Sequence, residues 1–392
     1  MSQSKRSIFT RLYVGNGAFD IVGKRKRWYV LFGVVLLICI ASIIFRGFNL
    51  GIDFTGGTRI QMPANSASGT ISQEAVKESF AKAIGEEPTS VQTVGTGESA
   101  TIQVRSETLD AAKVTSLKEG LNADLKPTGG LETISDSAVS ASWGGEITTK
   151  ALIALAVFFI AVAIFLALYF EWSMAVAALV AVVHDVVITA GIYSLVGFEV
   201  SPATVIGLLT ILGFSLYDTV VVFDKVKENT RGLLGLTRRT YPEAANLAVN
   251  QTLMRSINTS LIALLPVVGL LAIGVGLLGV GTLKDLALVQ LTGMAIGALS
   301  SIYIATPAAV DLKMRDPRYK AQAARVRQRR DNLARKASGE VVSGGDVVES
   351  SDDESLQAEL RREKALTAAA GVPSRTGKVA DARRRPTGKK HR

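Results

Sequence analysis

Six long apolar runs decide what this chain can fold into. Each is close to or above the ~20 residues that a helix needs to cross about 30 Å of hydrocarbon. The runs cover residues 28–46, 149–170, 173–196, 202–223, 256–279 and 285–310. The sequence therefore predicts a mainly α membrane protein with six transmembrane helices.

The composition supports the membrane class. Of the 392 residues 48% are hydrophobic, and the mean hydropathy of +0.30 accompanies a net charge of +10. A soluble domain rarely combines these values. A nucleic-acid binder would also be basic, but here the basic residues flank the apolar runs, as orientation signals do. We therefore expect membrane lipid around the chain and no nucleic-acid partner. Cys39, the one cysteine, is expected to be a small buried hydrophobe.

Lys and Arg set the expected orientation. They are dense in residues 1–27, after the fourth run, and from residue 311 onward. The side rich in Lys and Arg is cytoplasmic in multi-pass proteins. The first run exceeds a signal peptide's apolar length and lacks a small-residue cleavage site, so it is expected to be an uncleaved anchor.

The predicted organisation follows from these spans, and the multi-pass chain is placed in the cytoplasmic (plasma) membrane. Both termini are expected to be cytoplasmic. The segments are a cytoplasmic N-terminal segment 1–27, transmembrane helix 28–46, an extracytoplasmic domain 47–148, transmembrane helices 2–6 within 149–310, and a basic cytoplasmic tail 311–392.

The exported segment 47–148 shows alternating strand and helix patterns. "TRIQM" indicates a strand, and residues 72–85 have a Ser cap, apolar residues at helical spacing and a Gly stop. "SVQTV" and "TIQVR" flank "GTGES" as a hairpin, a second helical pattern covers 107–125, and a last strand covers 131–140. The order β-α-β-β-α-β predicts an α+β ferredoxin-like domain. Such a domain could bind a partner or be an inert spacer.

Two cytoplasmic segments are predicted to lie outside the helices. The tail is rich in Arg, Ala, Ser and Gly, and we expect it to be largely disordered. Within it "YKAQAARVRQRRDNLARK" could form a basic helix on anionic lipid, remain solvated, or contact ribosomal RNA. The loop from "FDKVKEN" to "NQTLM" is amphipathic with a break near 232–240, which favours interfacial helices.

Asp218 is an ionisable group inside the fourth apolar run. An Asp at the centre of a spanning helix costs roughly 2.5–3.5 kcal/mol even on a lenient scale, so it needs a reason. The fifth run opens with Arg255. A carboxylate beside an arginine keeps its charge, and one buried alone takes up a proton. We interpret Asp218 as a proton carrier and Arg255 as its switchable partner; the alternative is a static ion pair.

Further polar residues lie in the same apolar runs. Asp185 follows His184 in the third run. Neighbouring helix residues point in different directions, so the two side chains are not expected to face the same partner. Asp185, Thr219, Asn258 and Thr259 are candidates for a relay or for helix contacts. His184 is the weaker carrier candidate.

Glycines mark both junctions of the exported domain. "GIDFTGG" and "SWGGEITTK" suit hinges, although ordinary turns also use glycine. The candidate hinge residues are Gly51, Gly56, Gly57, Gly144 and Gly145. Gly293 and Gly297 form a small-xxx-small pair that predicts close helix packing.

Four motifs together resemble one family. "FNLGIDFTGGTRIQ", "GFSLYDTVVVFDKVKEN", "LAVNQTLMRSINTSL" and "GMAIGALSSIYIATP" resemble motifs of the SecD/SecF proteins, over roughly residues 20–312. This resemblance implies membership of the resistance-nodulation-division superfamily. Tyr217 departs from the Asn that the family often has before the acid, but the carboxylate of Asp218 is kept.

The resemblance also implies a function. It suggests an accessory subunit of the Sec translocase that uses the proton motive force, with protons favoured over Na⁺, to promote late steps of export. The implied partners are SecD, the SecYEG channel, YajC and exported unfolded polypeptides. No cofactor is implied.

Three rival interpretations remain open. Tyr217-Asp218 mimics the "YD" of aspartyl intramembrane proteases, but "VVHD" is not the G-x-G-D motif that those enzymes carry. A small-molecule or lipid exporter of the superfamily would need a second six-helix unit. A passive scaffold of the export channel would use Asp218 only for structure. "GTGES" lacks the Lys of a P-loop, and two histidines do not make a metal cage, so no enzyme is predicted.

Overall fold

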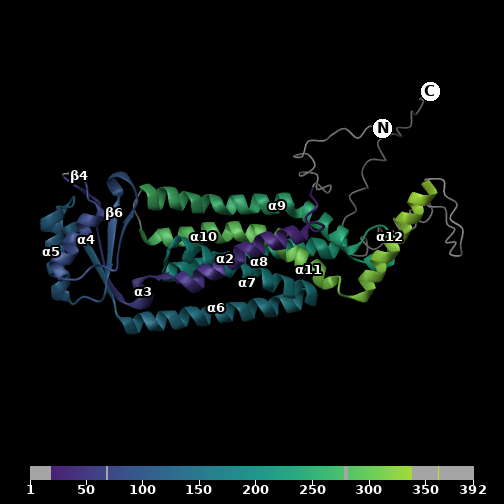
Figure 1. Ribbon diagram of the computed structural model, residues 1–392, viewed down its shortest axis with the longest axis horizontal. Helices are drawn as coiled ribbons and strands as arrows, with labels where there is room; N and C mark the ends of the chain where they lie inside the picture. Colours follow the sequence, from purple (N-terminus) through teal and green to yellow (C-terminus); the bar gives the residue numbers. More distant parts are fainter. Residues whose placement is uncertain (1–18, 68, 278–280, 338–360, 362–392) are drawn as a thin grey trace, which may run out of the picture.

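The computed structural model describes residues 19–67, 69–277, 281–337 and 361. The molecule is elongated, with a small domain containing a β-sheet at one end and a bundle of long helices beside it (Figure 1). The helix that follows the bundle, α12, lies at the far end from the sheet. The two ends of the bundle are called here the domain end and the tail end.

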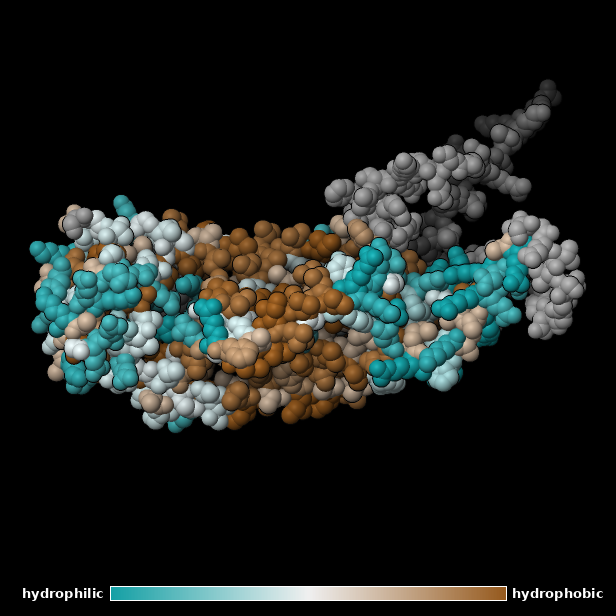
Figure 2. All heavy atoms as spheres, viewed as in Figure 1, coloured by the Kyte–Doolittle hydropathy of each residue, from teal (hydrophilic) through white to brown (hydrophobic). Residues whose placement is uncertain are grey.

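The six predicted spanning helices are present. Six helices of the described chain are long and apolar enough to cross a membrane. Each span starts in one of six helices, which are α2 (Arg25–Arg46), α6 (Ala141–Tyr169), α7 (Trp172–Val196), α8 (Pro202–Asn229), α9 (Tyr241–Gly269) and α10 (Gly281–Ser300). Their middle portions form an apolar belt between two hydrophilic ends (Figure 2). This belt is what a lipid-facing bundle requires.

Two of the helices continue as π-helix. α9 passes into η4 (Leu270–Leu277), and α10 passes into η5 (Ser301–Ala305) and then α11 (Thr306–Lys313). Pro266 lies inside α9 just before the first of these segments. Proline removes a backbone donor and clashes with the preceding turn, so a change of helical register after it is expected. π-segments are rare and are often found at functional sites.

The interfacial helices predicted before the fifth span are not observed. A 3₁₀ turn, η3 (Leu233–Gly235), lies in the predicted break, but from Tyr241 the chain is one continuous helix. Thr240 and Glu243 cap its start reciprocally. One face of the first turns of α9 is buried against the rest of the bundle, and Glu243 on the other side is exposed. Alanines at 244, 245 and 248 explain this, because small side chains let neighbouring helices approach closely.

The segment before α2 is fixed to α9. Two asparagines one turn apart, Asn246 and Asn250, bond the backbone of residues 19–22. Ile21 and Val22 are buried beside them. α2 itself packs along α7, where Cys39 is buried at 2% exposure against Gly191, as predicted for a small hydrophobe.

The described part of the basic tail is helical and packs against the bundle. α12 (Pro317–Ala337) covers most of the described tail and is packed, with Gln322 and Val326 fully buried. Gln322 donates from Nε2 to the carbonyls of Leu236 (2.9 Å) and Arg239 (3.0 Å). A basic helix over these residues was one of the alternatives for the tail, but its packing through Gln322 was not predicted, because the acceptors belong to a distant segment that no local pattern reveals. Residues 338–360 and 362–392 lie outside the described residues.

The domain beyond the bundle has four antiparallel strands in the order β5-β6-β2-β7. These are β5 (Ser90–Val94), β6 (Thr101–Ser106), β2 (Gly57–Pro63) and β7 (Ser135–Val139). Both helices, α4 (Gln73–Ile84) and α5 (Ala111–Leu125), cover one face, where they share a core with the alternate sheet residues Ile60, Met62, Ile102 and Val104. We call residues 57–139 the sheet domain.

Local signals set the boundaries within the sheet domain. Ser72 caps α4 by accepting from Ala75, and Gly85 ends it in a left-handed conformation. Asp110 caps α5, so this helix begins a turn later than the pattern over 107–125 suggests. Short elements complete the region: η1 (Gly97–Ser99), η2 (Gly130–Thr133), and the strand pair β3 (Asn65–Ser66) and β4 (Gly69–Thr70).

Short elements join the sheet domain to the bundle. β1 (Asn49–Leu50) pairs in parallel with β8 (Glu199–Val200), which connects α7 to α8. α3 (Ile52–Thr55) follows β1 and packs against α6. The sheet domain is thus attached to the bundle by tertiary contacts as well as by its two chain connections.

Candidate functional site

Two carboxylates are buried among the bundle helices. Asp218 lies on α8 at 7% exposure, and Asp185 lies on α7 at 3%. Neither has a Lys or Arg ion-pair partner in the described part of the chain. Their hydrogen-bond partners are hydroxyl groups, with one histidine at Asp185.

Asp218 is held between three helices. Ser256 of α9 donates from Oγ to Asp218 Oδ1 at 2.6 Å, and Ser301, the first residue of η5, donates to Oδ2 at 2.7 Å. Each carboxylate oxygen therefore has one hydroxyl donor. A serine hydroxyl can donate to a carboxylate or accept from a carboxyl group, so this arrangement is compatible with both protonation states.

Asp185 is held in a similar way. Ser215 of α8 donates to Asp185 Oδ2 at 2.5 Å, and Ser300 of α10 donates to the same oxygen at 2.7 Å. His184 Nδ1 lies 3.1 Å from Asp185 Oδ1. The two neighbours contact each other, while Asp185 also bonds the two serines. His184 also packs edge-on against Phe32 of α2.

The two carboxylates are connected through adjacent serines. Ser300 bonds Asp185 and Ser301 bonds Asp218, at the point where α10 changes to π-helix. Gly297 lies one turn before, and a Cβ there would be 2.9 Å from that of Ser215. Gly293 is likewise closed in by Ile211, so the predicted small-residue face packs against α8. This close approach is what brings the serines within reach of the acids.

Arg255 is not the partner of Asp218 in this structure. Its Nη2 donates to the hydroxyl of Tyr217 at 3.2 Å on the exposed side of α9. Successive helix residues differ by about 100° in direction, and here Ser256 rather than Arg255 points at the Asp218 carboxylate. Ser256 has the inward position, and the predicted Asp218–Arg255 pair is absent from the described ion pairs.

The remaining candidate relay residues have different surroundings. Thr219 is fully buried, and its hydroxyl has no hydrogen-bond partner in the described structure. Asn258 is exposed on α9. Thr259 lines a small cavity of about 20 Å³ together with Ser260, Tyr217 and Asp218. That volume is about the space that one water needs.

Sequence reasoning did not identify any of the four serines as a partner of the two acids. Ser215, Ser300 and Ser301 were not singled out, although "ALSSIY" places two adjacent hydroxyls in an apolar run. Buried polar residues in spanning helices are rare enough to be a signal. What the sequence could not indicate is which carboxylate each serine would meet.

The five predicted hinge glycines are mostly sites of close packing. A Cβ at Gly144 would lie 2.6 Å from the carbonyl oxygen of Phe54 in α3, and one at Gly51 would lie 2.7 Å from Glu199 Oε1. Gly56 (φ +77°) and Gly57 (φ +132°) are similarly blocked, and their φ values favour glycine. Only Gly145 among the five has open space. A hinge role for these residues stays a prediction.

Among the described residues, no group of three or more His, Cys, Asp or Glu side chains could hold a metal ion.

The comparisons with known proteins agree on one family. Residues 121–315 match the family described as "Protein export membrane protein SecD/SecF, C-terminal", and residues 41–67 match the "SecD/SecF GG Motif". The second match spans the end of α2, β1, α3, all of β2 and β3. It therefore includes the junction between the bundle and the sheet domain.

Curated relatives match over nearly the whole chain. The protein translocase subunit SecF of Mycobacterium tuberculosis strain H37Rv is 49% identical over 397 residues, covering 98% of this chain and 89% of the relative. That of Streptomyces coelicolor is 42% identical over 384 residues, covering 98% of each.

A solved structure has the same architecture. The crystal structure of SecDF, a translocon-associated membrane protein from Thermus thermophilus, superposes with a TM-score of 0.65 at 31% identity. The match covers 75% of this chain and 38% of the solved one. These relatives and the six apolar helices show a multi-pass membrane protein that belongs to the SecD/SecF family of protein export membrane proteins.

Proposed function

We propose that this chain is an accessory subunit of the Sec protein translocase that, together with a SecD protein, uses the proton motive force to promote protein export. Relatives of nearly the same length are named protein translocase subunit SecF. The match covers 75% of this chain but only 38% of the SecDF structure, which is thus about twice as long and supports pairing of this six-helix unit with a SecD unit. SecYEG, YajC and unfolded exported polypeptides are the further partners in this proposal.

We propose the membrane orientation from the distribution of charge. The tail end of the bundle carries the basic segment of α2, the loop after α8 and α12, and it is the cytoplasmic end. The sheet domain is then extracytoplasmic, and its strand order with both helices on one face supports a ferredoxin-like fold. The membrane in this proposal is the cytoplasmic membrane.

The observation that carries the proposal is the environment of Asp218. It is an acid buried in the middle of an apolar helix, bonded by hydroxyls from two other helices. Moving one charge through 100 mV supplies about 2.3 kcal/mol, which biases a two-state equilibrium tens-fold. Loss or gain of a proton at Asp218 would change its bonds to α9 and η5 together.

Arg255 has a place in this cycle. It lies next to Ser256 on α9 and binds Tyr217, which precedes Asp218 on α8. A rotation of α9 by about 100°, the angle between successive helix residues, would exchange Ser256 for Arg255 at the carboxylate. We propose that this exchange stabilises the ionised acid in a second state, while Asp185 holds α7, α8 and α10 together through Ser215 and Ser300.

The test is export into inverted membrane vesicles at fixed ATP, with the proton and sodium gradients dissipated separately. Asp218→Asn keeps the shape of the side chain but not its titration, and it should lower export to the level seen without this protein. Asp224→Asn, an exposed acid on the same helix, is the matched control and should keep full activity. Full gradient-dependent export by Asp218→Asn would favour the passive scaffold instead.

A further inference from the structure

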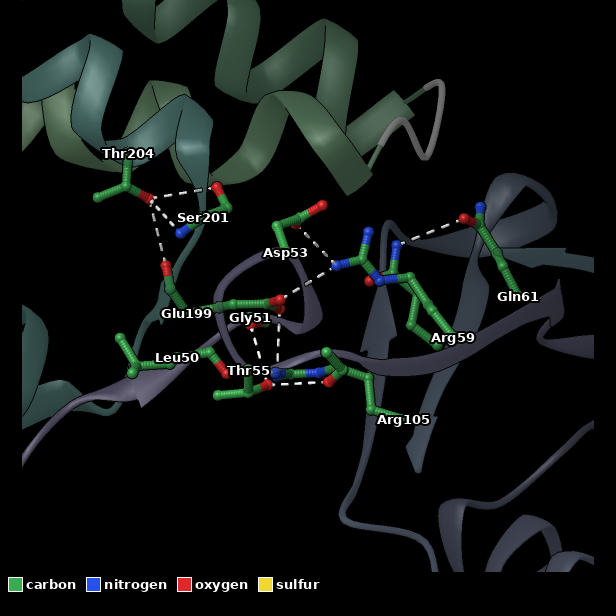
Figure 3. Close-up of polar contacts among 12 residues, drawn as sticks. Leu50, Gly51, Asp53, Thr55, Arg59, Gln61, Arg105, Glu199, Ser201 and Thr204 are labelled. Atoms are coloured by element: carbon green, nitrogen blue, oxygen red, sulfur yellow. Dashed lines mark hydrogen bonds and ion pairs between the residues drawn. The ribbon is translucent and has the colours of Figure 1, made fainter. Parts of the chain in front are cut away.

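A buried glutamate links the sheet domain to the helix bundle. Glu199 lies in β8, three residues before α8 begins at Pro202, and its side chain is 8% exposed. Its two oxygens point toward arginines of the sheet domain (Figure 3). Arg59 of β2 lies 3.3 Å from Oε1, and Arg105 of β6 lies 3.1 Å from Oε2.

The two arginines need an anion between them. Arg59 and Arg105 are directly opposite each other on neighbouring antiparallel strands. Like charges in that position destabilise a sheet. Asp53 of α3 is 3.6 Å from Arg59, and burial lowers the pKa of Arg105 although Glu199 opposes that effect. The sheet domain by itself therefore carries an unfavourable pair that Glu199, a residue of the bundle, neutralises.

Backbone contacts close the same junction. Gly51 donates its N–H to the carbonyl of Val200 at 2.8 Å, and Arg105 Nη1 donates to the carbonyl of Leu50 at 3.2 Å. The turn at Gly51 thus lies between Glu199 and Arg105 (Figure 3). Glycine lets the two segments approach closely, because a Cβ at this position would lie 2.7 Å from Glu199 Oε1.

The junction is stiffly connected to Asp218. The N–H of Ser201 donates to Thr204 Oγ1 at 3.1 Å and caps α8 directly after Glu199. From Pro202 to Asp218 is one uninterrupted helix of roughly 24 Å. α9, which carries Ser256, also reaches the sheet domain, because Thr96 donates to the carbonyl of Gly276 at the end of η4.

We propose that Glu199, Arg59 and Arg105 form the joint through which a change at Asp218 moves the sheet domain. These are positioning residues, which we call the domain joint, and the proposal rests on the proposed function. Breaking one partner out of a buried ion pair leaves an unpaired charge and is strongly unfavourable. The joint therefore makes β8 and the sheet domain move as one body when α8 shifts, instead of letting the domain tilt on glycine hinges.

The experiment uses the full chain with its SecD partner in vesicles, and three variants: Glu199→Gln, Arg105→Gln and the double variant. We expect each single variant to lose gradient-driven export by about tenfold, a difference of about 1.4 kcal/mol in the driving equilibrium. Glu132→Gln, an exposed acid of the sheet domain, is the control and should export normally. Normal export by Glu199→Gln would overturn the proposal.

The double variant separates a joint from a merely stabilising pair. Removing both charges leaves Arg59 paired with Asp53 and no unpaired buried ion, so a purely structural pair predicts recovery of export. A joint predicts that export stays low although stability recovers. Recovery of export in the double variant would therefore overturn the proposal.

Proton flux distinguishes this proposal from the proposed function. A pH dye in the same vesicles should show that Glu199→Gln keeps gradient-driven proton flux while export is lost, whereas Asp218→Asn loses both. Equal loss of flux and export in Glu199→Gln would contradict a transmitting role. Unchanged flux and export in Asp218→Asn would refute the proposed function itself.

A distance measurement tests the joint without any transport. Spin labels are attached through cysteines introduced at Glu78 on α4 and Ile206 on α8, because both positions are exposed. The buried Cys39 should not react with the label. In the otherwise unaltered chain the distance distribution should be narrow and should shift in Asp218→Asn. In Glu199→Gln it should broaden, and the shift should disappear. A narrow distribution that still shifts in Glu199→Gln would refute the joint.

Discussion

Ser301 donates a hydrogen bond to Asp218 at the residue where the last spanning helix changes from α to π geometry. The neighbouring Ser300 reaches Asp185 on a different helix. The π-turn therefore lies directly beside the bonds to both buried acids. A helix segment with irregular hydrogen bonding is easier to rearrange than a regular one, which suits a site where the partners of a carboxylate change.

Removing the Ser301 hydroxyl should weaken coupling. Hydrogen bonds to charged groups contribute about 1.5–3 kcal/mol, so Ser301→Ala should reduce gradient-driven export roughly tenfold or more. Ser300→Ala is the matched variant because it acts on Asp185 instead. Export in inverted vesicles, with and without a proton gradient, measures both. Wild-type export by Ser301→Ala would show that this bond is dispensable.

Arg255 and Tyr217 should differ in importance although they contact each other. If Arg255 moves to Asp218 during the cycle, Tyr217→Phe removes only a resting contact and should keep most of the export activity. Arg255→Lys keeps a cation but loses the planar fork, so partial loss is expected, and Arg255→Gln should lose nearly all. Retained activity in Arg255→Gln would exclude the arginine from the cycle.

Gly144 and Gly145 provide a direct test of packing against hinge roles. Gly144→Ala would place a methyl against the Phe54 carbonyl, and overpacking of this kind costs about 1–3 kcal/mol. Gly145→Ala has open space and gains helix propensity of about 1 kcal/mol. Thermal unfolding in detergent should show a lower midpoint for the first and an equal or higher one for the second. Equal lowering by both variants would instead support flexibility at this site.

Docking of α12 should depend on Gln322. Gln322→Leu keeps the volume but leaves the carbonyls of Leu236 and Arg239 without these donors, a loss of about 1–3 kcal/mol. Because α12 is rich in arginine, trypsin should cut within residues 318–335 several-fold faster in this variant. Gln328→Leu, exposed on the same helix, is the control. Similar digestion of both variants would mean that Gln322 does not hold the helix.

Much of the architecture could be predicted from local pattern. Apolar length predicts six spanning helices because a helix must satisfy its backbone bonds within one segment in lipid. Ser72 and Gly85 delimit α4 because capping depends on neighbouring residues alone. Asp218 could be singled out because a charged side chain in an apolar run is expensive wherever its helix lies.

Which side chains contact one another between distant segments was decided only by the tertiary structure. Ser256 rather than Arg255 meets Asp218 because the rotation of α9 against α8 depends on close packing along their whole length. The same holds for the order in α12, which depends on carbonyls some 80 residues away. Glu199 had no sequence signal at all, since its arginines are brought to it by a sheet register and a domain contact. A sequence pattern reports what each residue costs or favours in its own segment, whereas contacts between segments depend on the packing of all of them together.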